Sequence, residues 1–398
     1  MKIGILREEK NTPDKRVVFS PKQCRYIKEH TEFELVVQTS NIRCFSDDEY
    51  VNENIEVVHD LSECDILLGI KEVPVMKLIA EKTYFFFSHT IKKQKYNRLL
   101  LKSLIEKKIK MVDYEVLKEN NSRLLGFGKF AGIVGAYNAF LTYGKKFCKY
   151  KINPAHNCYD INEFYKELNK VLLSKERILI TGGGRVATGI LEVLKYLDIK
   201  SVSKEDFINN KYNYPIFCQL DSIDYYKRID DLNASKNDLY SNPHKYKSIF
   251  MNYANHADIY IAGHFYDERA PFIYTHEDVM SPKFKIKVVA DISCDIAGPI
   301  ATTIRPSSIS SPIYGYNPLT GKEDDFMFEN VIAVMAVDNL PCELPRDSSV
   351  HFGDNFIKLI LPLFNNINYD PIISGATICE NGALTNNFNY LREFVNQE

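Results

Sequence analysis

The sequence contains no tryptophan and no pair of cysteines with the Cys-x-x-Cys spacing. Its nine cysteines are scattered singly along the chain. An odd number of cysteines without an export signal predicts reduced thiols rather than a zinc site or a disulfide framework. The nine histidines also lack a ligand spacing such as His-Glu-x-x-His, so we expect no metal site.

The chain also lacks an excess of charge of one sign and any long hydrophobic run. Fifty Lys and Arg residues stand against 52 Asp and Glu residues, so no overall charge attracts nucleic acid or an anionic membrane. Apolar runs such as residues 331–337 are far shorter than the ~20 residues of a membrane-spanning helix. The N-terminus turns polar too early for a secretory signal peptide. We therefore expect a cytoplasmic protein with neither a nucleic-acid nor a membrane partner.

The 398 residues, 45% of them hydrophobic and 26% charged, are typical of a globular protein with two domains. Short apolar segments alternate with helical stretches, a pattern that predicts parallel α/β sheets. The expected strands are residues 2–6, 33–38, 66–70, 84–87, 110–113, 178–181, 258–262, 288–292 and 331–337. Residues 209–255 are rich in Tyr, Asn, Lys and Asp, and we interpret them as a surface insertion with short helices.

A glycine-rich motif follows the apolar strand at residues 178–181 and precedes an apolar-periodic helix. In this Gly-x-Gly-x-x-Ala pattern, Gly182 allows a tight turn and Gly184 lets the backbone approach a pyrophosphate. Ala187 permits close packing of the helix on the strand, and the helix N-terminus is left to hold the anion. The strand–loop–helix context predicts a dinucleotide-binding site.

The choice between NAD and NADP stays open at this point. An acidic residue is expected about 20 positions after the glycine motif, where it binds the ribose 2′-hydroxyl of NAD. Glu205 or Asp206 is a candidate for this role, whereas Ser203 and Lys204 are suited to the 2′-phosphate of NADP.

Lys71 and His89 each follow a predicted strand directly. Ligands of parallel α/β sheets collect at the carboxyl ends of strands, so both side chains are expected to face one cleft. Taken alone, Lys71 is more typical of a surface lysine, and His89 is more typical of a hydrogen-bonded loop histidine.

Several segments in order resemble one enzyme family. The chain resembles the lysine-forming saccharopine dehydrogenases and, more closely, the lysine–ketoglutarate reductase half of the bifunctional lysine-degrading enzyme. Alanine dehydrogenase shares the positions of Arg16, Lys71 and His89. The matching segments are residues 16–21, 68–74, 87–94, 113–115, 126–132, 291–295, 337–341 and 344–346.

The resemblance implies a role for each matching residue. Lys71 corresponds to a general base and His89 to a general acid, while Glu72 and Glu115 are acidic neighbours that tune the site. The implied substrate-binding residues are Arg16, Gln94, Arg123, Phe127, Ser293, Cys294 and Asp295. The resemblance places cofactor contacts at Gly184, Arg185, Ile292, Asp338, Asn339, Leu340 and Pro341, but it does not match an acidic partner for the ribose. The other cofactor-binding candidates, Gly182, Ala187 and Glu205, come from the glycine motif and its spacing. One branch of the family has an arginine pair where this chain has Ser122 and Arg123.

These observations predict two Rossmann-like α/β domains with parallel sheets and an active site in the interdomain cleft. Residues 1–128, completed by 343–398, are expected to form the catalytic domain, and residues 129–342 the dinucleotide-binding domain. The expected reaction is the NAD(P)-dependent interconversion of saccharopine with L-lysine and 2-oxoglutarate. The alternatives are an amino-acid dehydrogenase similar to alanine dehydrogenase and a non-catalytic nicotinamide-binding protein. The sequence leaves the direction of the reaction and the oligomeric state open.

Overall fold

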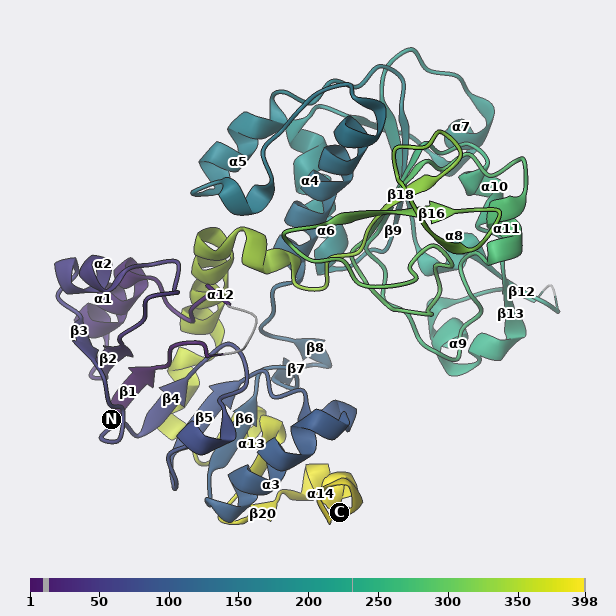
Figure 1. Cartoon of the computed structure of the whole chain (residues 1–398). Helices are drawn as coiled ribbons and strands as arrows, with labels where there is room; N and C mark the ends of the chain where they lie inside the picture. Colours follow the sequence, from purple (N-terminus) through teal and green to yellow (C-terminus); the bar gives the residue numbers. More distant parts are fainter. Residues whose placement is uncertain (10–13, 231, 397–398) are drawn as a thin grey trace. The chain divides into compact units, whose positions relative to one another are not determined.

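The computed structural model describes residues 1–9, 14–230 and 232–396. The chain divides into two compact units, of which unit 1 comprises Met1–Phe127 and Pro345–Glu398 and unit 2 comprises Gly128–Leu344. Each unit is built on an eight-stranded, mainly parallel sheet, which confirms the predicted α/β fold class (Figure 1).

The sheet of unit 1 has the strand order β20-β19-β6-β5-β4-β1-β2-β3. Its first six strands in the chain pair in parallel, while β19 is antiparallel to β6 and β20 is antiparallel to β19. The strands are β1 (Lys2–Ile5), β2 (Glu34–Gln38), β3 (Glu56–Val58), β4 (Ile66–Leu68), β5 (Thr83–Phe86), β6 (Lys110–Asp113), β19 (Thr377–Glu380) and β20 (Ala383–Leu384). A separate hairpin is formed by β7 (Lys118–Glu119) and β8 (Ser122–Arg123).

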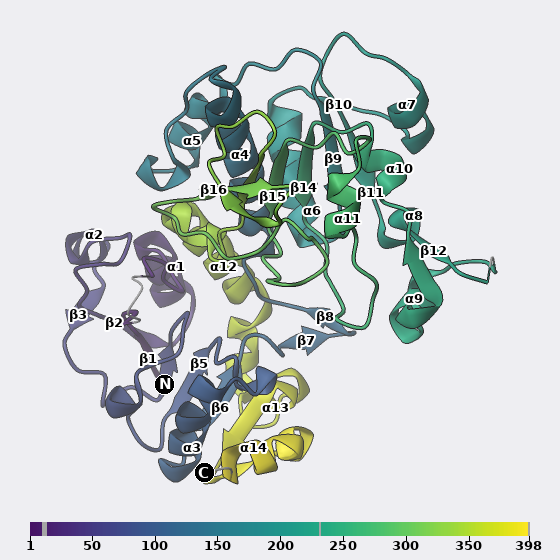
Figure 2. The ribbon, with the colours of Figure 1, turned by 45° about the vertical axis from the view of Figure 1, so that its right-hand side comes forward.

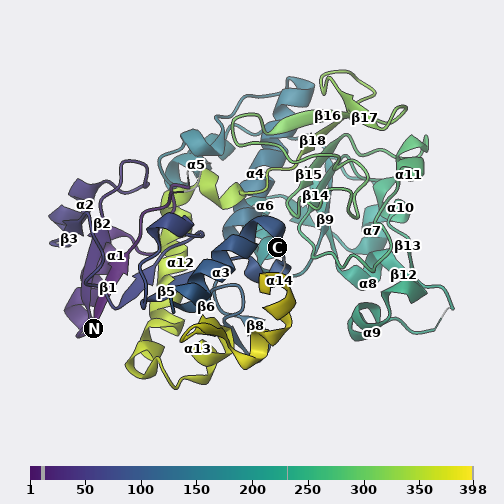
Figure 3. The ribbon, with the colours of Figure 1, turned by 60° about the horizontal axis from the view of Figure 1, so that its bottom comes forward.

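Helices cover both faces of this sheet because successive strand residues point to opposite sides. On β5, Phe85 joins a core with Phe352 and Phe356, whereas Tyr84 and Phe86 join the core on the other face. The helices are α1 (Pro21–His30), α2 (Asp47–Asn52), α3 (Arg98–Glu106), α12 (Pro345–Leu359), α13 (Pro371–Ala376) and α14 (Arg392–Asn396). Figure 3 shows the C-terminal segments in yellow beside the blue strands of the N-terminal part.

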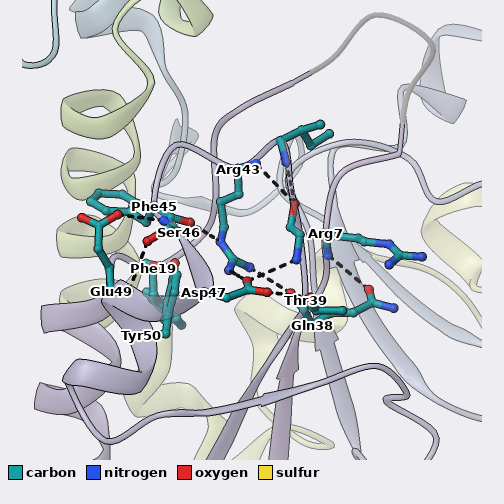
Figure 4. Close-up of polar contacts among 12 residues, drawn as sticks. Arg7, Phe19, Gln38, Thr39, Arg43, Phe45, Ser46, Asp47, Glu49 and Tyr50 are labelled. Carbon is teal, nitrogen blue, oxygen red and sulfur yellow. Dashed lines mark hydrogen bonds and ion pairs between the residues drawn. The ribbon is translucent and has the colours of Figure 1, made fainter.

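The buried side chain of Arg43 fixes the loop between β2 and α2. Its guanidinium donates hydrogen bonds to the carbonyl oxygens of Gln38 (2.9 Å) and Phe45 (2.9 Å) and to the carboxylate of Asp47 (2.6 Å) (Figure 4). It also lies over the Tyr50 ring, 4.4 Å from the ring centroid. The next residue, Cys44, donates its backbone N–H to the carbonyl of Lys15, so this loop supports the segment that contains Arg16.

The sheet of unit 2 has the strand order β10-β11-β9-β14-β15-β18-β16-β17. The strands from β10 to β18 in this order are parallel. The strands β16 and β17 add antiparallel pairs at the edge next to β18 (Figure 3). The strands are β9 (Arg177–Thr181), β10 (Lys200–Ser201), β11 (Ile216–Leu220), β14 (Ile259–Ala262), β15 (Val288–Asp291), β16 (Ile313–Asn317), β17 (Lys322–Asp324) and β18 (Ile332–Met335).

Two helices of unit 2 touch through glycines. A side chain on Gly132 of α4 would lie 1.9 Å from the Val186 carbonyl oxygen of α6, and one on Gly189 of α6 would lie 2.0 Å from the Lys129 carbonyl oxygen. The two backbones are therefore in direct contact. The helices of unit 2 are α4 (Gly128–Phe147), α5 (Ile161–Leu168), α6 (Arg185–Tyr196), α7 (Lys204–Asn209), α8 (Ser222–Tyr225), α9 (Lys236–Ser241), α10 (Met251–Ala254) and α11 (His276–Met280).

The interpretation of residues 209–255 as a surface insertion is wrong for part of this segment. Strand β11 lies inside it and pairs with β9 in the centre of the sheet, with Ile216 opposite Arg177. The remaining residues form short helices and a hairpin of β12 (Tyr226–Arg228) and β13 (Tyr246–Ser248). The strand was missed because it has only five residues and polar sequence lies on both sides of it.

Across the described part of the chain, no helix combines the length and the apolar character needed to cross a membrane.

We expect Gly132→Val to destabilise unit 2 strongly, because any side chain at this position collides with backbone that cannot move independently. The expected loss of unfolding free energy is at least ~2 kcal/mol, measured as a lower melting temperature by calorimetry. The matched control is Gly375→Ala in α13, where an added methyl group meets no atom within 4 Å. An unchanged melting temperature of Gly132→Val would contradict the close helix contact.

Candidate functional site

The carboxyl edge of the sheet in unit 1 brings Lys71 and His89 onto neighbouring chain segments. The strands β4 and β5 pair in parallel, and beyond them the Phe87 backbone N–H donates to the Ile70 carbonyl at 3.0 Å. Lys71 and His89 follow this bonded pair by one and two residues. Both are partly exposed, and His89 has a left-handed backbone conformation with φ 53°.

His89 is held by Glu115. The ring atom Nδ1 lies 3.3 Å from Oε2 of Glu115. The other carboxylate oxygen, Oε1, lies 3.5 Å from Lys92 Nζ and 3.3 Å from Arg123 Nη2. Burial opposes ionisation of Glu115, but these three partners outweigh it and lower its pKa to about 2. An ionised carboxylate only accepts hydrogen bonds, so Nδ1 of His89 is the donor. The other ring nitrogen, Nε2, is then the atom suited to proton exchange.

Asp113, at the end of β6, shapes the turn that carries His89. Its buried carboxylate accepts hydrogen bonds from the backbone of Ser88 (3.2 Å) and Glu115 (2.7 Å) and from the Ser88 hydroxyl. Burial raises the pKa of Asp113 to about 6. Asp113 therefore connects the residue before His89 with the residue that binds its ring.

Sequence reasoning missed Glu8. Its buried carboxylate accepts the backbone N–H groups of Ile70 (2.7 Å) and Lys71 (2.9 Å). Burial, assisted by the negative charge of Asp14, raises the pKa of Glu8 to about 8. Glu8 thus fixes the backbone at Lys71, and its position three residues after the end of β1 was the available signal.

Arg16 is buried and engaged within unit 1. Its Nε and Nη2 atoms donate to the Asp14 carboxylate at 3.0 and 2.6 Å, and the guanidinium lies over the Phe127 ring at 4.2 Å. Phe127 in turn stacks on Phe352 with ring centroids 4.8 Å apart. Asp14 occupies the Nε and Nη2 atoms of Arg16, so the expected substrate contact has to use the rest of the guanidinium.

The remaining predicted residues of unit 1 lie in different surroundings. Gln94 is exposed, before the short 3₁₀ helix Lys95–Asn97. Glu72 is half-buried next to Lys71. Arg123 is exposed on β8 and is brought to His89 only through Glu115.

In unit 2, the glycine loop has the geometry of a dinucleotide site. Gly182 has φ 111°, and a side chain there would lie 2.4 Å from the Gly263 carbonyl. Gly184 precedes α6 without a side-chain cap, and the space where its side chain would lie is open to 4 Å. Ala187 is buried, whereas Arg185 is exposed in the first turn of α6. Uncapped N–H groups beside open space fit a pyrophosphate.

The acidic residue next to this loop is Asp221, not Glu205. Asp221 directly follows β11, the parallel neighbour of β9, and a side chain on Gly183 would lie 3.6 Å from its carboxylate. Glu205 is exposed in the first turn of α7, after the edge strand β10. Glu205 does not lie beside Gly183, and its ribose contact stays a prediction. This prediction relied on the usual spacing of about 20 residues, which the segment containing β10 and α7 lengthens.

Asp291 organises the loop after β15. Its carboxylate accepts the N–H groups of Ser293 (3.0 Å) and Cys294 (3.2 Å) and the Ser293 hydroxyl (2.7 Å). Burial raises the pKa of the Cys294 thiol to about 12, so it stays protonated at neutral pH. Asp295 follows, half-buried.

The second predicted cofactor-binding segment, residues 338–341, is partly buried in unit 2. The side chains of Leu340 and Pro341 are buried, and Leu340 belongs to the hydrophobic core. Ile292 is half-buried against Gly135 of α4. Asp338 is exposed and Asn339 is half-buried, so these two remain accessible. A contact of Leu340 with a cofactor therefore has to use its backbone.

His264, which follows β14, was also missed. Its Nδ1 lies 2.8 Å from the Thr181 hydroxyl, directly before the glycine loop. Burial lowers the pKa of His264 to about 4, so the imidazole is neutral. A histidine one residue after Gly263 was the available sequence signal.

Within residues 1–9, 14–230 and 232–396, no three His, Cys, Asp or Glu side chains come together in a way that suits a metal ion.

The chain matches both domains of one protein family. The N-terminal domain of the alanine dehydrogenase/PNT family matches residues 4–134, and its C-terminal domain matches residues 170–387. Among solved structures, an L-alanine dehydrogenase has a TM-score of 0.68 at 16% identity, covering 99% of both chains. A transhydrogenase from Sinorhizobium meliloti has a TM-score of 0.62 at 12% identity, covering 97% of this chain and all of that one.

Curated relatives support the resemblance found in the sequence. An alpha-aminoadipic semialdehyde synthase of Arabidopsis thaliana is 27% identical over 98% of this chain and 41% of its own length. Its counterpart in Rattus norvegicus is 26% identical over 98% of this chain and 47% of its own length. This chain thus spans less than half of these relatives. An L-lysine-forming saccharopine dehydrogenase of Schizosaccharomyces pombe is 24% identical over 90% of this chain and 92% of its own length. The chain belongs to the alanine dehydrogenase/PNT family of oxidoreductases.

Proposed function

We propose that the chain is a nicotinamide-dependent oxidoreductase that interconverts saccharopine with L-lysine and 2-oxoglutarate. The names of the relatives support this substrate, since they include saccharopine dehydrogenases and alpha-aminoadipic semialdehyde synthases. The observation that carries the proposal is the adjacency of the backbone segments that hold Lys71 and His89, together with the contact of His89 with Glu115.

In this proposal Lys71 accepts a proton from the secondary amine as the C–N bond is oxidised to an imine. Water then adds to the imine carbon, and His89 donates a proton through Nε2 to the amine that departs, which leaves 2-oxoglutarate and L-lysine. Glu115 keeps Nδ1 protonated and stabilises the positive charge that His89 carries when both ring nitrogens hold protons. Arg123 and Lys92 share the Glu115 carboxylate and add positive charge where the anionic substrate approaches.

The bound cofactor would exchange a hydride with the carbon of the C–N bond. Gly182, Gly184 and the first turn of α6 are suited to hold its pyrophosphate. We further propose a preference for NAD over NADP, because Asp221 offers a carboxylate to a ribose 2′-hydroxyl and repels a 2′-phosphate. Burial opposes ionisation of Asp221, but its hydrogen bonds with Lys236 and the Ser222 backbone lower its pKa.

The deciding experiment is an assay of NADH oxidation with purified protein. Oxidation that requires both L-lysine and 2-oxoglutarate is expected. Oxidation with pyruvate and ammonia instead would favour the amino-acid dehydrogenase alternative. Binding of NADH by calorimetry without turnover of either substrate set would favour a non-catalytic protein.

We expect Lys71→Met and His89→Gln each to reduce kcat by about 10²-fold, because each removes a proton-transfer group. The affinity for NADH, measured by fluorescence titration, should stay unchanged. The matched controls are Lys102→Met and His59→Gln, which alter exposed residues of the same unit. Wild-type turnover in both site variants would remove this mechanism.

Asp221→Asn should lower the ratio of kcat/KM for NADH to that for NADPH by about tenfold. Asparagine retains an oxygen that can cap α8, so the fold should survive. Glu205→Gln is the control and should leave the ratio as it is in the wild type. A larger change of this ratio in Glu205→Gln than in Asp221→Asn would assign the ribose contact to Glu205.

Glu8→Gln should change the pH dependence of stability. Because the pKa of Glu8 is about 8 in the folded protein and near 4.5 when unfolded, the folded form binds more protons between these values. The wild type should therefore lose on the order of 1 kcal/mol of unfolding free energy per pH unit from about pH 5 to 8. The variant should lose much less over this range, as measured by urea denaturation.

Glu9→Gln serves as the control for this series, since Glu9 is only partly buried and its pKa is lowered rather than raised. Parallel stability curves for the wild type and Glu8→Gln would show that Glu8 does not titrate in this range.

A further inference from the structure

A cavity at the amino ends of the strands of unit 2 has no part in the proposed reaction. Its volume is about 840 Å³, within the range of about 300–1,000 Å³ that is typical of small-ligand sites. Its lining includes Arg177, the first residue of β9, and Asp258 and Lys287, which directly precede β14 and β15. These three strands lie side by side in Figure 2.

The cavity is separate from the glycine loop. Strand β9 runs from Arg177 at the cavity to Thr181, and Gly182 follows at its other end. Five strand residues with a rise of about 3.3 Å each separate the two places by roughly 16 Å. A ligand in this cavity therefore occupies the opposite edge of the sheet from a dinucleotide on the loop.

Positive charge dominates the cavity. Six cationic side chains line it: Lys149, Lys175, Arg177, Lys211, Lys285 and Lys287. Its two carboxylates are already engaged within the protein. Glu176 accepts hydrogen bonds from Lys149 Nζ (2.5 Å) and the Tyr143 hydroxyl (2.6 Å), and Asp258 accepts the backbone N–H of Arg177 (2.9 Å).

Four of the lysines have no ion-pair partner among the described residues. In the described chain, the ammonium groups of Lys175, Lys211, Lys285 and Lys287 make neither an ion pair nor a hydrogen bond. The same positive charge acts on the neighbouring His256, since burial and the charges of Arg177 and Lys285 lower its pKa.

Arg177 supplies a donor that is held in place among these lysines. Its guanidinium lies over the Phe207 ring at 4.7 Å, and Nη1 donates to the Asn210 carbonyl at 2.9 Å. The Nε and Nη2 atoms are buried and have no hydrogen-bond partner among the described residues. Buried donors without partners are costly, and the Nε–Nη2 edge matches two oxygens of a phosphate or carboxylate.

We propose that this cavity binds a small polyanion that carries several phosphate groups. The Nε–Nη2 edge of Arg177 would hold one phosphate, and the unpaired lysines would neutralise the others as point charges. A single monovalent anion would leave most of this positive charge unbalanced, so the multivalent class fits the cavity better.

The test is calorimetric titration of the full chain with inorganic tripolyphosphate, with and without saturating NADH. One binding event that NADH does not weaken is expected. Competition with NADH would locate the anion on the glycine loop and overturn the proposal, as would the absence of binding.

Two double variants locate the bound anion. Lys175→Glu combined with Lys211→Glu should weaken binding by at least about tenfold, because both exposed lysines line the cavity. Lys195→Glu combined with Lys322→Glu changes the net charge equally at exposed positions elsewhere in unit 2 and should weaken it less than about twofold. Equal weakening by both pairs would show that only the overall charge attracts the anion.

Arg177→Lys separates hydrogen-bond geometry from charge, because lysine keeps the positive charge and loses the planar edge. We expect about fivefold weaker binding at a temperature where a cooperative thermal transition shows that the variant is still folded. Wild-type affinity of this variant would contradict the role assigned to Arg177.

Discussion

The two hydrogen bonds that the Glu8 carboxylate accepts from Ile70 and Lys71 hold together the candidate catalytic edge of unit 1. They connect the segment after β1 with the segment after β4, and these two strands are neighbours in the sheet. Asp113 does the same for the segments after β5 and β6. Buried carboxylates thus replace continued strand pairing beyond the sheet, so each chemically active side chain begins from a fixed backbone.

Unit 2 meets a different constraint at its glycine loop. The loop leads into α6, and α6 rests on α4 through Gly132 and Gly189 with no side chain between the two backbones. This contact sets the direction of α6 and hence the direction in which its uncapped N–H groups point. The small residues of α4 predict only a buried helix when they are taken alone. In the fold they also position α6, whose N-terminus is the candidate anion site.

Local sequence was sufficient where one segment contains the whole feature. The glycine loop, with its strand before and helix after, was predicted at the right residues, as were most strands of both sheets. Asp221 was not, because its position depends on which strand lies beside β9, and β11 enters the sheet after the outer strand β10. Glu8 shows the same limit, since its contact with Lys71 joins residues far apart in the sequence, and the burial of Arg16 likewise follows from tertiary packing.

Unit 1 is interrupted by the 217 residues of unit 2, from Gly128 to Leu344. On the ribosome, the first strands emerge long before Phe352 and Phe356 of α12, which complete the core on one face of their sheet. At ~5–20 residues per second this interval is on the order of ten to forty seconds. The nascent N-terminal part of unit 1, Met1–Phe127, therefore keeps apolar surface exposed while unit 2 is made, a state in which proteins are prone to aggregate.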